Sequence, residues 1–391
     1  MCGDSDQRKM AGKNGRGKMN QFREPQSDQD YYSTFLRLPD EVEDEETVIE
    51  PRFSVQELLD HLIQQTETIV ARDLFVFSDL TVQDAELVRQ EWGLIPVEQR
   101  RQLLQSLVDV AESDIEWHLG RLMRIALEDP DEFIRAIAIE GLWEETSTDL
   151  VGPLVQILHN DRAQSVRAAA AAALGAYVLA GELDELDSAY AMRVEEALLA
   201  VLRNPEEDMD VQCRALESIA YSGETGVRQL IEDAYYAADE GTRVSSLIAM
   251  GRSADTRWRG LVRAELQNPS TQMRVEAARA CGELEVQQAE RELLELLNDE
   301  QQMVRLAAIY ALGRIGGRRV QERLRALAQS DDSIEAEAAD LALEEMLFFE
   351  NDDDVELWED EDEEEEDSWD VDPWDTFDEL EDDDFGTYED D

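Results

Sequence analysis

Lysine is nearly absent from this sequence, and its other reactive side chains are few and scattered. All three lysines lie before residue 20, and the remaining 32 basic residues are arginine. The 3 histidines, His61, His118 and His159, lie far apart, and the 3 cysteines have neither metal-ligand nor disulfide spacing. No apolar run approaches a membrane span, and none follows the charged N-terminus as in a secretory signal. We therefore expect a cytoplasmic protein, and its arginine and alanine content favours a bacterial one.

Positive charge is scarce throughout. The formal net charge is −59, and residues 350–391 contribute 26 Asp or Glu with no Lys or Arg, which leaves −33 for residues 1–349. A general nucleic-acid binder needs a positive surface to displace counterions from phosphates. Nucleic acid is therefore an unlikely partner for the body of the chain.

What the sequence does contain is a pattern that recurs about every 31 residues. Seven three-residue segments, such as Phe133-Ile134-Arg135 and Met303-Val304-Arg305, match one another along the chain. Their last residues are Arg135, Arg167, Gln212, Arg243, Arg274, Arg305 and Glu335. Three residues after each, the side chain is small: Ala138, Ala170, Ala215, Ser246, Ala277, Ala308 and Ala338. Self-similarity at such a period indicates stacked two-helix units. We predict an all-α, right-handed α-solenoid with disordered termini.

Four regions follow from composition and periodicity. Residues 1–50 are polar and predicted to be disordered, and residues 51–114 form a helical N-terminal cap. Residues 115–349 hold about seven repeat units, and residues 350–391 form a disordered acidic and aromatic tail. One repeat step is 14 residues longer than the others, and we place the surplus between Gly175 and Ala191, as an extended helix pair or a loop.

Shorter signals mark helix ends. Ser54 with Glu57, and Thr81 with Asp84, have the spacing of helix N-caps. Glycines at the ends of the predicted helices, in the N-terminal cap and in the repeats, are interpreted as C-caps: Gly93, Gly175, Gly251, Gly282, and Gly313, Gly316 and Gly317 in the segment 313–317. Cys213 and Cys281 fall on repeat helices and are expected to be small buried residues.

The period, the turn and the second-helix signature resemble HEAT repeats, in the short form typical of phycobilisome lyases. In that family an Asp in the turn and an Arg six residues later form a hydrogen-bonded ladder between neighbouring units. The matching pairs are Asp129 with Arg135, Asp161 with Arg167, Asn268 with Arg274, and Asp299 with Arg305. The unit at Gln212 has Glu206 but no Arg, and the last unit has Glu335. The resemblance thus implies a ladder that is interrupted in the middle and absent at the end.

No pattern of catalytic residues emerges. The HEAT-like deoxyhypusine hydroxylases bind iron through His-Glu pairs, and here each histidine is followed by Leu, Leu or Asn. Neither a Gly-x-Ser-x-Gly motif nor a phosphate-binding glycine loop occurs. We expect no catalytic residue, no cofactor and no metal.

Two arginine-rich stretches contrast with the acidic body. The candidate partner-binding residues in them are Arg252, Arg257, Arg259, Arg263, Arg314, Arg318, Arg319 and Arg323. Three interpretations remain open: ladder or inter-unit ion pairs, which we favour, docking of an acidic protein segment, or nucleic acid. HEAT-like DNA glycosylases combine such a basic groove with aromatic residues, and Trp258 lies between two of these arginines.

The tail adds a second candidate. A solvating tail needs no aromatics, yet this one carries Trp369, Trp374, Phe377 and Leu380. The last three recur every three residues after Pro373, as in a helix that folds on binding. Ordering such a helix costs about as much as its apolar burial gains, so a basic counter-surface is required. That surface is either the arginine-rich part of the same protein or an external basic protein.

These observations predict a non-enzymatic, protein-binding scaffold or adaptor whose acidic tail serves regulation or partner binding. The alternative is a lyase-like or chaperone-like factor that acts on a chromophore or a protein substrate. The two separate by whether the purified protein shifts the absorbance of a bilin.

Overall fold

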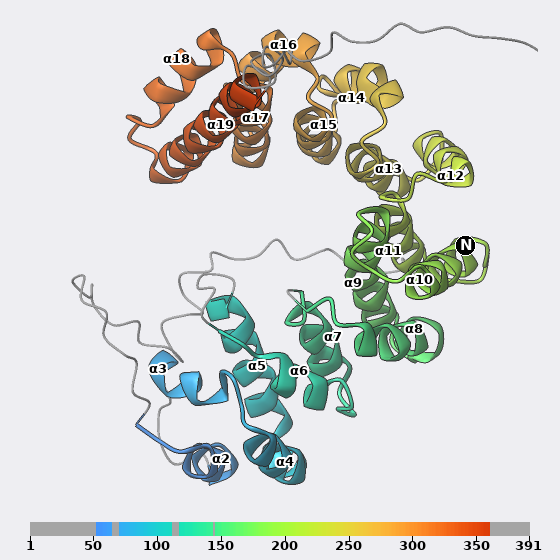
Figure 1. Cartoon of the computed structure of the whole chain (residues 1–391), viewed down its shortest axis with the longest axis vertical. Helices are drawn as coiled ribbons and strands as arrows, with labels where there is room; N and C mark the ends of the chain where they lie inside the picture. Colours follow the sequence, from blue (N-terminus) through green and yellow to red (C-terminus); the bar gives the residue numbers. More distant parts are fainter. Residues whose placement is uncertain (1–51, 65–69, 112–116, 144, 360–391) are drawn as a thin grey trace, which may run out of the picture. The chain divides into compact units, whose positions relative to one another are not determined.

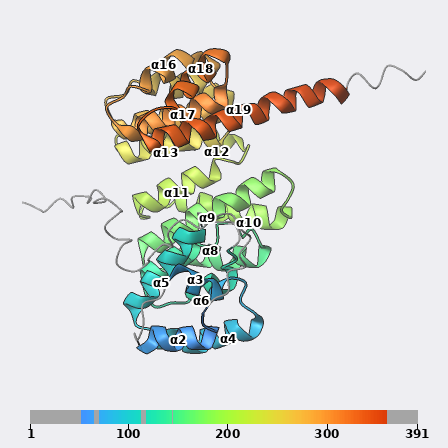
Figure 2. The same cartoon turned by 90° about the vertical axis from the view of Figure 1, so that its left-hand side faces the viewer.

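The computed structural model describes residues 52–64, 70–111, 117–143 and 145–359 (Figures 1 and 2). Within these ranges the structure is helical and contains no β-strand. Its packing divides the chain into two compact units, Met1–Ala249 and Met250–Asp391, and the boundary falls inside helix α13.

The first unit is a succession of helix pairs. Its elements are α2 (Val55–Gln64), α3 (Ala71–Leu74), η1 (Phe75–Phe77), α4 (Val82–Glu91), η2 (Trp92–Leu94), α5 (Val97–Ala111), α6 (Gly120–Ala126), α7 (Glu132–Glu140), η3 (Thr148–Leu150), α8 (Val151–Asn160), α9 (Gln164–Glu182), α10 (Ser188–Leu202), α11 (Met209–Ile219), α12 (Thr225–Tyr235) and α13 (Glu240–Arg252). The first helix of one pair packs on the first helix of the next, as α4 does on α6 and α8 on α10. The second helices of successive pairs pack in the same way, α5 on α7, α7 on α9 and α9 on α11. Each helix pair thereby buries its apolar face against the neighbouring pairs, which is the stacking that the repeat predicts.

The second unit repeats this plan. Its elements are η4 (Thr256–Trp258), α14 (Arg259–Glu265), α15 (Thr271–Glu283), η5 (Gln287–Ala289), α16 (Glu290–Leu296), α17 (Gln302–Ile315), α18 (Arg318–Leu327) and α19 (Ser333–Glu359). Helices α15, α17 and α19 pack side by side, and α14, α16 and α18 each pair with the helix that follows (Figure 1).

The predicted helix starts near the N-terminal end are present. At α2, the Ser54 N–H donates to Glu57 Oε2 over 2.9 Å, and the Glu57 N–H donates back to Ser54 Oγ. At α4, Thr81 Oγ1 accepts from the Asp84 N–H over 3.1 Å. These bonds satisfy backbone donors that the first turn of a helix leaves without a partner.

The small residue of each repeat lies where two second helices approach. Ala138, Ala170, Ala215, Ser246, Ala277 and Ala308 are all 0% exposed. The last unit departs from the predicted register by one residue. Ile334 is 53% exposed and Ala338 is half-buried, whereas Ala339 is fully buried. The expected alignment fails there because Ile334 has the apolar character of the buried position but lies one residue too early.

The interpretation of four glycines as C-caps is wrong. Gly175, Gly251, Gly282 and Gly313 lie inside helices α9, α13, α15 and α17. A Cβ on Gly282 would lie 2.9 Å from Ala311 Cα, and one on Gly313 would lie 2.8 Å from Ala342 Cβ. These glycines therefore permit close approach between second helices. Gly316 and Gly317 do end α17, with φ values of 72° and 105° that favour glycine.

The longer repeat step is an extended helix pair. Helix α9 has 19 residues and α10 has 15, and together they take up the surplus. At the other end of the chain, α19 continues to Glu359, past the boundary at residue 350 that composition suggests. The predicted disordered segment 1–50 and the greater part of the tail, from residue 360 onward, lie outside the described residues.

Candidate functional site

A ladder of arginines links successive turns in the second unit. Arg274 donates from Nε and Nη2 to both oxygens of Asp299, over 2.9 and 3.1 Å. Its Nη1 donates to the carbonyl oxygen of Asn268, over 3.0 Å. Arg305 has the same geometry, with Nε 2.6 Å from Glu335 Oε1 and Nη1 2.9 Å from the carbonyl oxygen of Asp299. Each arginine therefore binds its own turn through the backbone and the next turn through a carboxylate.

The first unit contains the same arrangement. Arg135 pairs with both oxygens of Asp161 over 2.8 Å, and Arg167 donates to Glu207 Oε1 over 3.2 and 2.7 Å. Burial by itself would raise the pKa of Asp161, but the Arg135 hydrogen bonds and the Ala163 N–H outweigh it and lower that pKa. The pKa of Glu207 is lowered in the same way by Arg167.

The ladder differs from the sequence expectation at two acceptors. Arg167 binds Glu207 rather than Glu206, which lies six residues before Gln212, where the family pattern has its Asp. The ladder is also present at the last unit, where it was expected to be absent, because Glu335 accepts from Arg305. In the middle it is interrupted: Gln212 donates only to the Asn204 carbonyl oxygen, over 2.6 Å. Nε of Arg243 is buried and has no hydrogen-bond partner among the described residues.

The ladder begins one unit earlier than the sequence indicates. Asp129 Oδ2 accepts from Trp92 Nε1 over 2.7 Å and from Arg100 Nη1 over 2.6 Å, and the Asp129 side chain is fully buried. Next to it, Arg101 binds both oxygens of Asp131. Sequence comparison missed this link because its donors belong to helices that lack the repeat signature.

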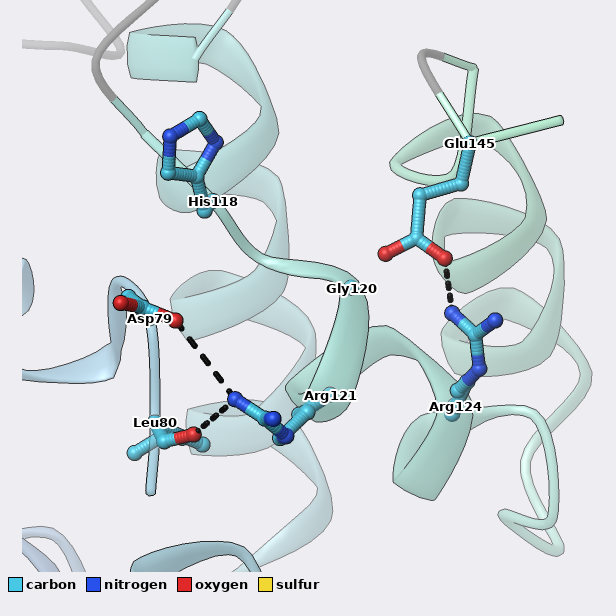
Figure 3. A pocket seen from close by; sticks show the side chains of 7 residues that line it. All are labelled: Asp79, Leu80, His118, Gly120, Arg121, Arg124 and Glu145. Carbon is cyan, nitrogen blue, oxygen red and sulfur yellow. Dashed lines mark hydrogen bonds and ion pairs between the residues drawn. The ribbon is translucent and has the colours of Figure 1, made fainter. Parts of the chain in front are cut away.

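A charged pocket of about 420 Å³ lies between the turn after η1 and the N-terminal end of α6 (Figure 3). Arg121 donates from Nη1 to the Leu80 carbonyl oxygen over 2.6 Å, and Arg124 forms an ion pair with Glu145. A Cβ on Gly120 would meet the Glu145 carboxylate, so a larger residue there would require that side chain to move. Both arginines of the pocket are thus held by acceptors of the protein itself.

A second hollow, of about 720 Å³, lies along α7, α9 and α11. Its floor is formed by alanines of α9, and Trp143, 59% exposed, lies at its edge. The charged side chains that line it are Glu140, Asp210 and Arg214, and Arg214 pairs with Glu217 over 2.6 Å. This surface was not predicted. The only signal for it was the run of alanines in α9.

The candidate arginines around α14 are occupied internally. Arg257 pairs with Asp255 over 2.9 Å, Arg259 Nε donates to the Leu284 carbonyl oxygen, and Arg263 donates to Glu292. The hydrogen bonds from Arg263 lower the pKa of Glu292. Arg252 has interactions of its own. Most of this stretch serves packing within the protein.

Trp258 is 4% exposed, with Arg257 5.8 Å from its ring centroid. A base would need an accessible aromatic face on which to stack. The one feature that favoured nucleic acid is therefore buried.

The arginines of α18 differ. Arg314, just before the helix, pairs with Glu345 over 3.2 Å. Arg318 and Arg319 have side chains 92% and 72% exposed, and their nearest acids, Glu322 and Glu290, are 3.5 and 3.8 Å away. Beyond them on the same helix are Arg323 and Arg325, for which the described part of the chain supplies no hydrogen bond or ion pair.

A hollow of about 400 Å³ lies beside these arginines, between α16 and α18. Leu294 and Ala326 provide apolar surface, and Arg319, Glu322 and Arg323 surround it. We call this hollow, together with Arg318 and Arg325, the α18 groove. The other predicted partner-binding residues, Trp369, Trp374, Phe377 and Leu380, lie outside the described residues.

Two further findings concern the described ranges. They contain no cluster of three or more His, Cys, Asp or Glu side chains that could hold a metal ion. Nor do they contain a helix with both the length and the apolar character that crossing a bilayer requires.

Burial raises the pKa of the Cys281 thiol to about 12, and both Cys213 and Cys281 are buried, as the repeat predicts.

Several solved structures are similar to this chain. The complex of CpcE and CpcF of phycocyanin lyase from Nostoc sp. PCC7120 is 20% identical, covers 58% of this chain and 94% of its own, and has a TM-score of 0.38. Human deoxyhypusine hydroxylase is 17% identical, with 68% and 96% covered and a TM-score of 0.31. Importin beta is 15% identical, with 75% and 46% covered and a TM-score of 0.37. None of these likenesses indicates a function.

No curated protein matches the sequence. Residues 261–344 match HEAT repeats. These residues run from α14 to α19 and include two arginines of the ladder, Arg274 and Arg305. With this match and its stacked two-helix units, the chain is a HEAT-like repeat protein.

Proposed function

We propose that this protein is a non-enzymatic cytoplasmic scaffold or adaptor that binds an acidic protein segment in the α18 groove. The proposal rests on Arg323 and Arg325, whose side chains form no hydrogen bond or ion pair within the described residues. In a chain with a net charge of −59, these two side chains have no acidic partner among the described residues. Arginine that is not needed for the protein's own packing remains available for carboxylates of a partner.

The shape and chemistry of the groove support a peptide ligand. Leu294 and Ala326 offer a small apolar contact, while Arg319 and Arg323 flank it with guanidinium groups. A planar guanidinium both pairs with carboxylates and stacks on aromatic rings. The groove therefore fits an aromatic side chain with acidic neighbours better than a purely acidic run.

Helix α18 is also the most positive of the described helices. Its ten residues hold four arginines and one glutamate, whereas α16, on the opposite side of the groove, holds one arginine and three glutamates. This local contrast orients an acidic ligand toward α18. Charge of this kind steers the encounter and sets specificity more than it sets affinity.

The test uses a fluorescein-labelled acidic peptide containing two tryptophans. It is titrated with the full chain carrying Trp369→Ala, Trp374→Ala and Phe377→Ala, so that the chain's own aromatics do not compete. We expect saturable binding, and Arg323→Glu with Arg325→Glu should weaken it at least tenfold. Unchanged affinity in this double variant would refute the proposal.

The matched control is Arg72→Glu with Arg89→Glu on the first unit. Both side chains are exposed, and the substitution changes the net charge by the same amount. Because the change lies far from α18 in the sequence and in the other unit, it should leave binding within about twofold. Equal weakening by both double variants would mean that total charge, rather than the α18 groove, determines binding.

A further inference from the structure

We infer that residues 369–388 of the same chain occupy the α18 groove, so that the tail acts as a built-in competitor of the external partner. This inference rests on the proposed function, because it assigns an occupant to the same groove. It goes further in predicting that the protein regulates its own binding site.

The chemistry of the tail matches the groove. In the segment Asp372–Asp378, Trp374 and Phe377 alternate with carboxylates, and no basic residue occurs after Arg325. An aromatic ring placed on Leu294 and Ala326 would share the hollow with the guanidinium groups of Arg319 and Arg323, which its acidic neighbours could pair with. A purely aliphatic or purely acidic segment would satisfy only half of these groups.

The geometry brings the tail within reach. The Arg314 Nη1 to Glu345 Oε1 ion pair, 3.2 Å long, places the start of α18 close to Glu345 on α19. Helix α19 ends at Glu359, 14 residues later, which corresponds to about 21 Å of helix (Figure 2). The nine residues from 360 to 368 can span about 30 Å. Residue 369 can therefore return to α18 without a change in any described helix.

Covalent attachment makes the contact effective even if it is weak. A short tether gives the tail an effective concentration in the millimolar range. Charge attraction is screened beyond about 8 Å at physiological salt, so the aromatic contacts must supply specificity. Docking should therefore depend on Trp374 and Phe377 as well as on the arginines.

Zero-length crosslinking offers a direct test, because the chain has no lysine after residue 18. Arg323→Lys introduces a single amine into the groove of the full-length protein. Carbodiimide treatment should then join the new amine of Arg323→Lys to a carboxylate within residues 370–384, which mass spectrometry of chymotryptic peptides identifies. Trp374→Ala with Phe377→Ala should reduce the yield at least fivefold. Arg89→Lys, next to Glu86, is the control that should give no tail adduct.

The outcomes separate this inference from the proposed function. If the amine links only to nearby acids such as Glu322 and Glu290, or if the tail adduct is an intermolecular dimer, docking within one chain is wrong. The labelled acidic peptide gives a second readout. It should bind the triple-alanine tail variant at least fivefold more tightly than the wild type. Equal binding to both would remove the competitor but leave the α18 groove as a binding site, whereas no binding to either would refute the proposed function itself.

Discussion

The arginines of the ladder and the arginines of α18 are chemically identical but differ in exposure and in their internal partners. Arg274 and Arg305 each satisfy a backbone carbonyl and a carboxylate of the next turn, and their side chains are only 16% and 21% exposed. Arg318 and Arg319 are 92% and 72% exposed, and their acids lie at the limit of an ion pair. The first pair stabilises the stack of helices, whereas the second is exposed and contributes little to packing.

The difference lies in the neighbours rather than in the arginines. A ladder arginine projects toward an acid of the next repeat, 25 to 40 residues later in the sequence. The outer face of α18 has no later turn of this kind, because α19 is the last described helix. Within the described residues, Arg323 and Arg325 of this helix accordingly form no hydrogen bond or ion pair.

The largest expected effect is at the start of the ladder. Asp129→Ala removes the acceptor of Trp92 Nε1 and of Arg100, whose side chain is 9% exposed. Because a buried cation would then lack its partner, we expect a loss of about 3–5 kcal/mol in the free energy of unfolding. Urea denaturation followed by circular dichroism measures it. The control is Glu86→Ala, whose ion pair with Arg89 is exposed and should contribute less than about 1 kcal/mol. Similar losses in both variants would mean that Asp129 does not hold the first units together.

The second prediction compares the two classes of arginine directly. Arg305→Ala removes the bonds to Glu335 and to the Asp299 carbonyl oxygen, and it leaves Glu335 nearly buried without its partner. We expect a loss of about 2–3 kcal/mol. Arg325→Ala should change stability by less than about 0.5 kcal/mol, since an exposed side chain without partners contributes little to folding. If Arg325→Ala were as destabilising as Arg305→Ala, the α18 arginines would be structural.

Sequence reasoning identified the repeat, the helix pairs and the ladder arginines. It misassigned two acceptors because the family pattern compares residue types at fixed spacing, whereas a hydrogen bond requires only a carboxylate within reach. Glu207 replaces Glu206 in this way, and Glu335 accepts from Arg305 although it stands where a template expects arginine. Flexible acidic side chains make such shifts by one or several residues possible.

The candidate surface was harder to predict. Arginine is about equally dense around α14 and α18, so composition could not separate the two stretches. Only the folded structure shows that Arg263 donates to Glu292 and that Arg259 donates to the Leu284 carbonyl oxygen. Arg323 has no hydrogen bond or ion pair within the described residues. Partners separated by 25 to 30 residues follow from packing, which a linear pattern does not specify.

The third prediction applies the same contrast to glycine. Gly282→Ala would place a Cβ 2.9 Å from Ala311 Cα, so overpacking should cost about 1–3 kcal/mol. Gly260 is exposed within α14 and has no atom within 4 Å of a Cβ, so Gly260→Ala should stabilise by about 0.5–1 kcal/mol. The opposite signs are measured by urea denaturation. Equal signs would show that α15 and α17 do not approach as closely as described.

The smallest expected effect is a pH dependence that only the ladder should show. Burial by itself would raise the pKa of Asp299, but hydrogen bonds from Arg274 and the Gln301 N–H outweigh it and lower that pKa below 3.8. A group whose pKa is lower in the folded state stabilises the fold above its unfolded pKa, and this contribution is lost as pH falls through the folded value. The stability difference between the wild type and Arg274→Ala should therefore be constant between pH 7.0 and 5.5 and smaller at pH 3.0.

Arg325→Ala provides the reference, because its stability difference from the wild type should stay near zero at every pH. General effects of acid, such as the loss of repulsion among the many carboxylates, act on both variants and cancel in the comparison. A difference for Arg274→Ala that persists unchanged at pH 3.0 would mean that the arginine stabilises the turn through the Asn268 carbonyl oxygen alone, since that bond does not titrate. The ladder would then be a backbone clamp rather than a series of ion pairs, and its electrostatic contrast with α18 would disappear.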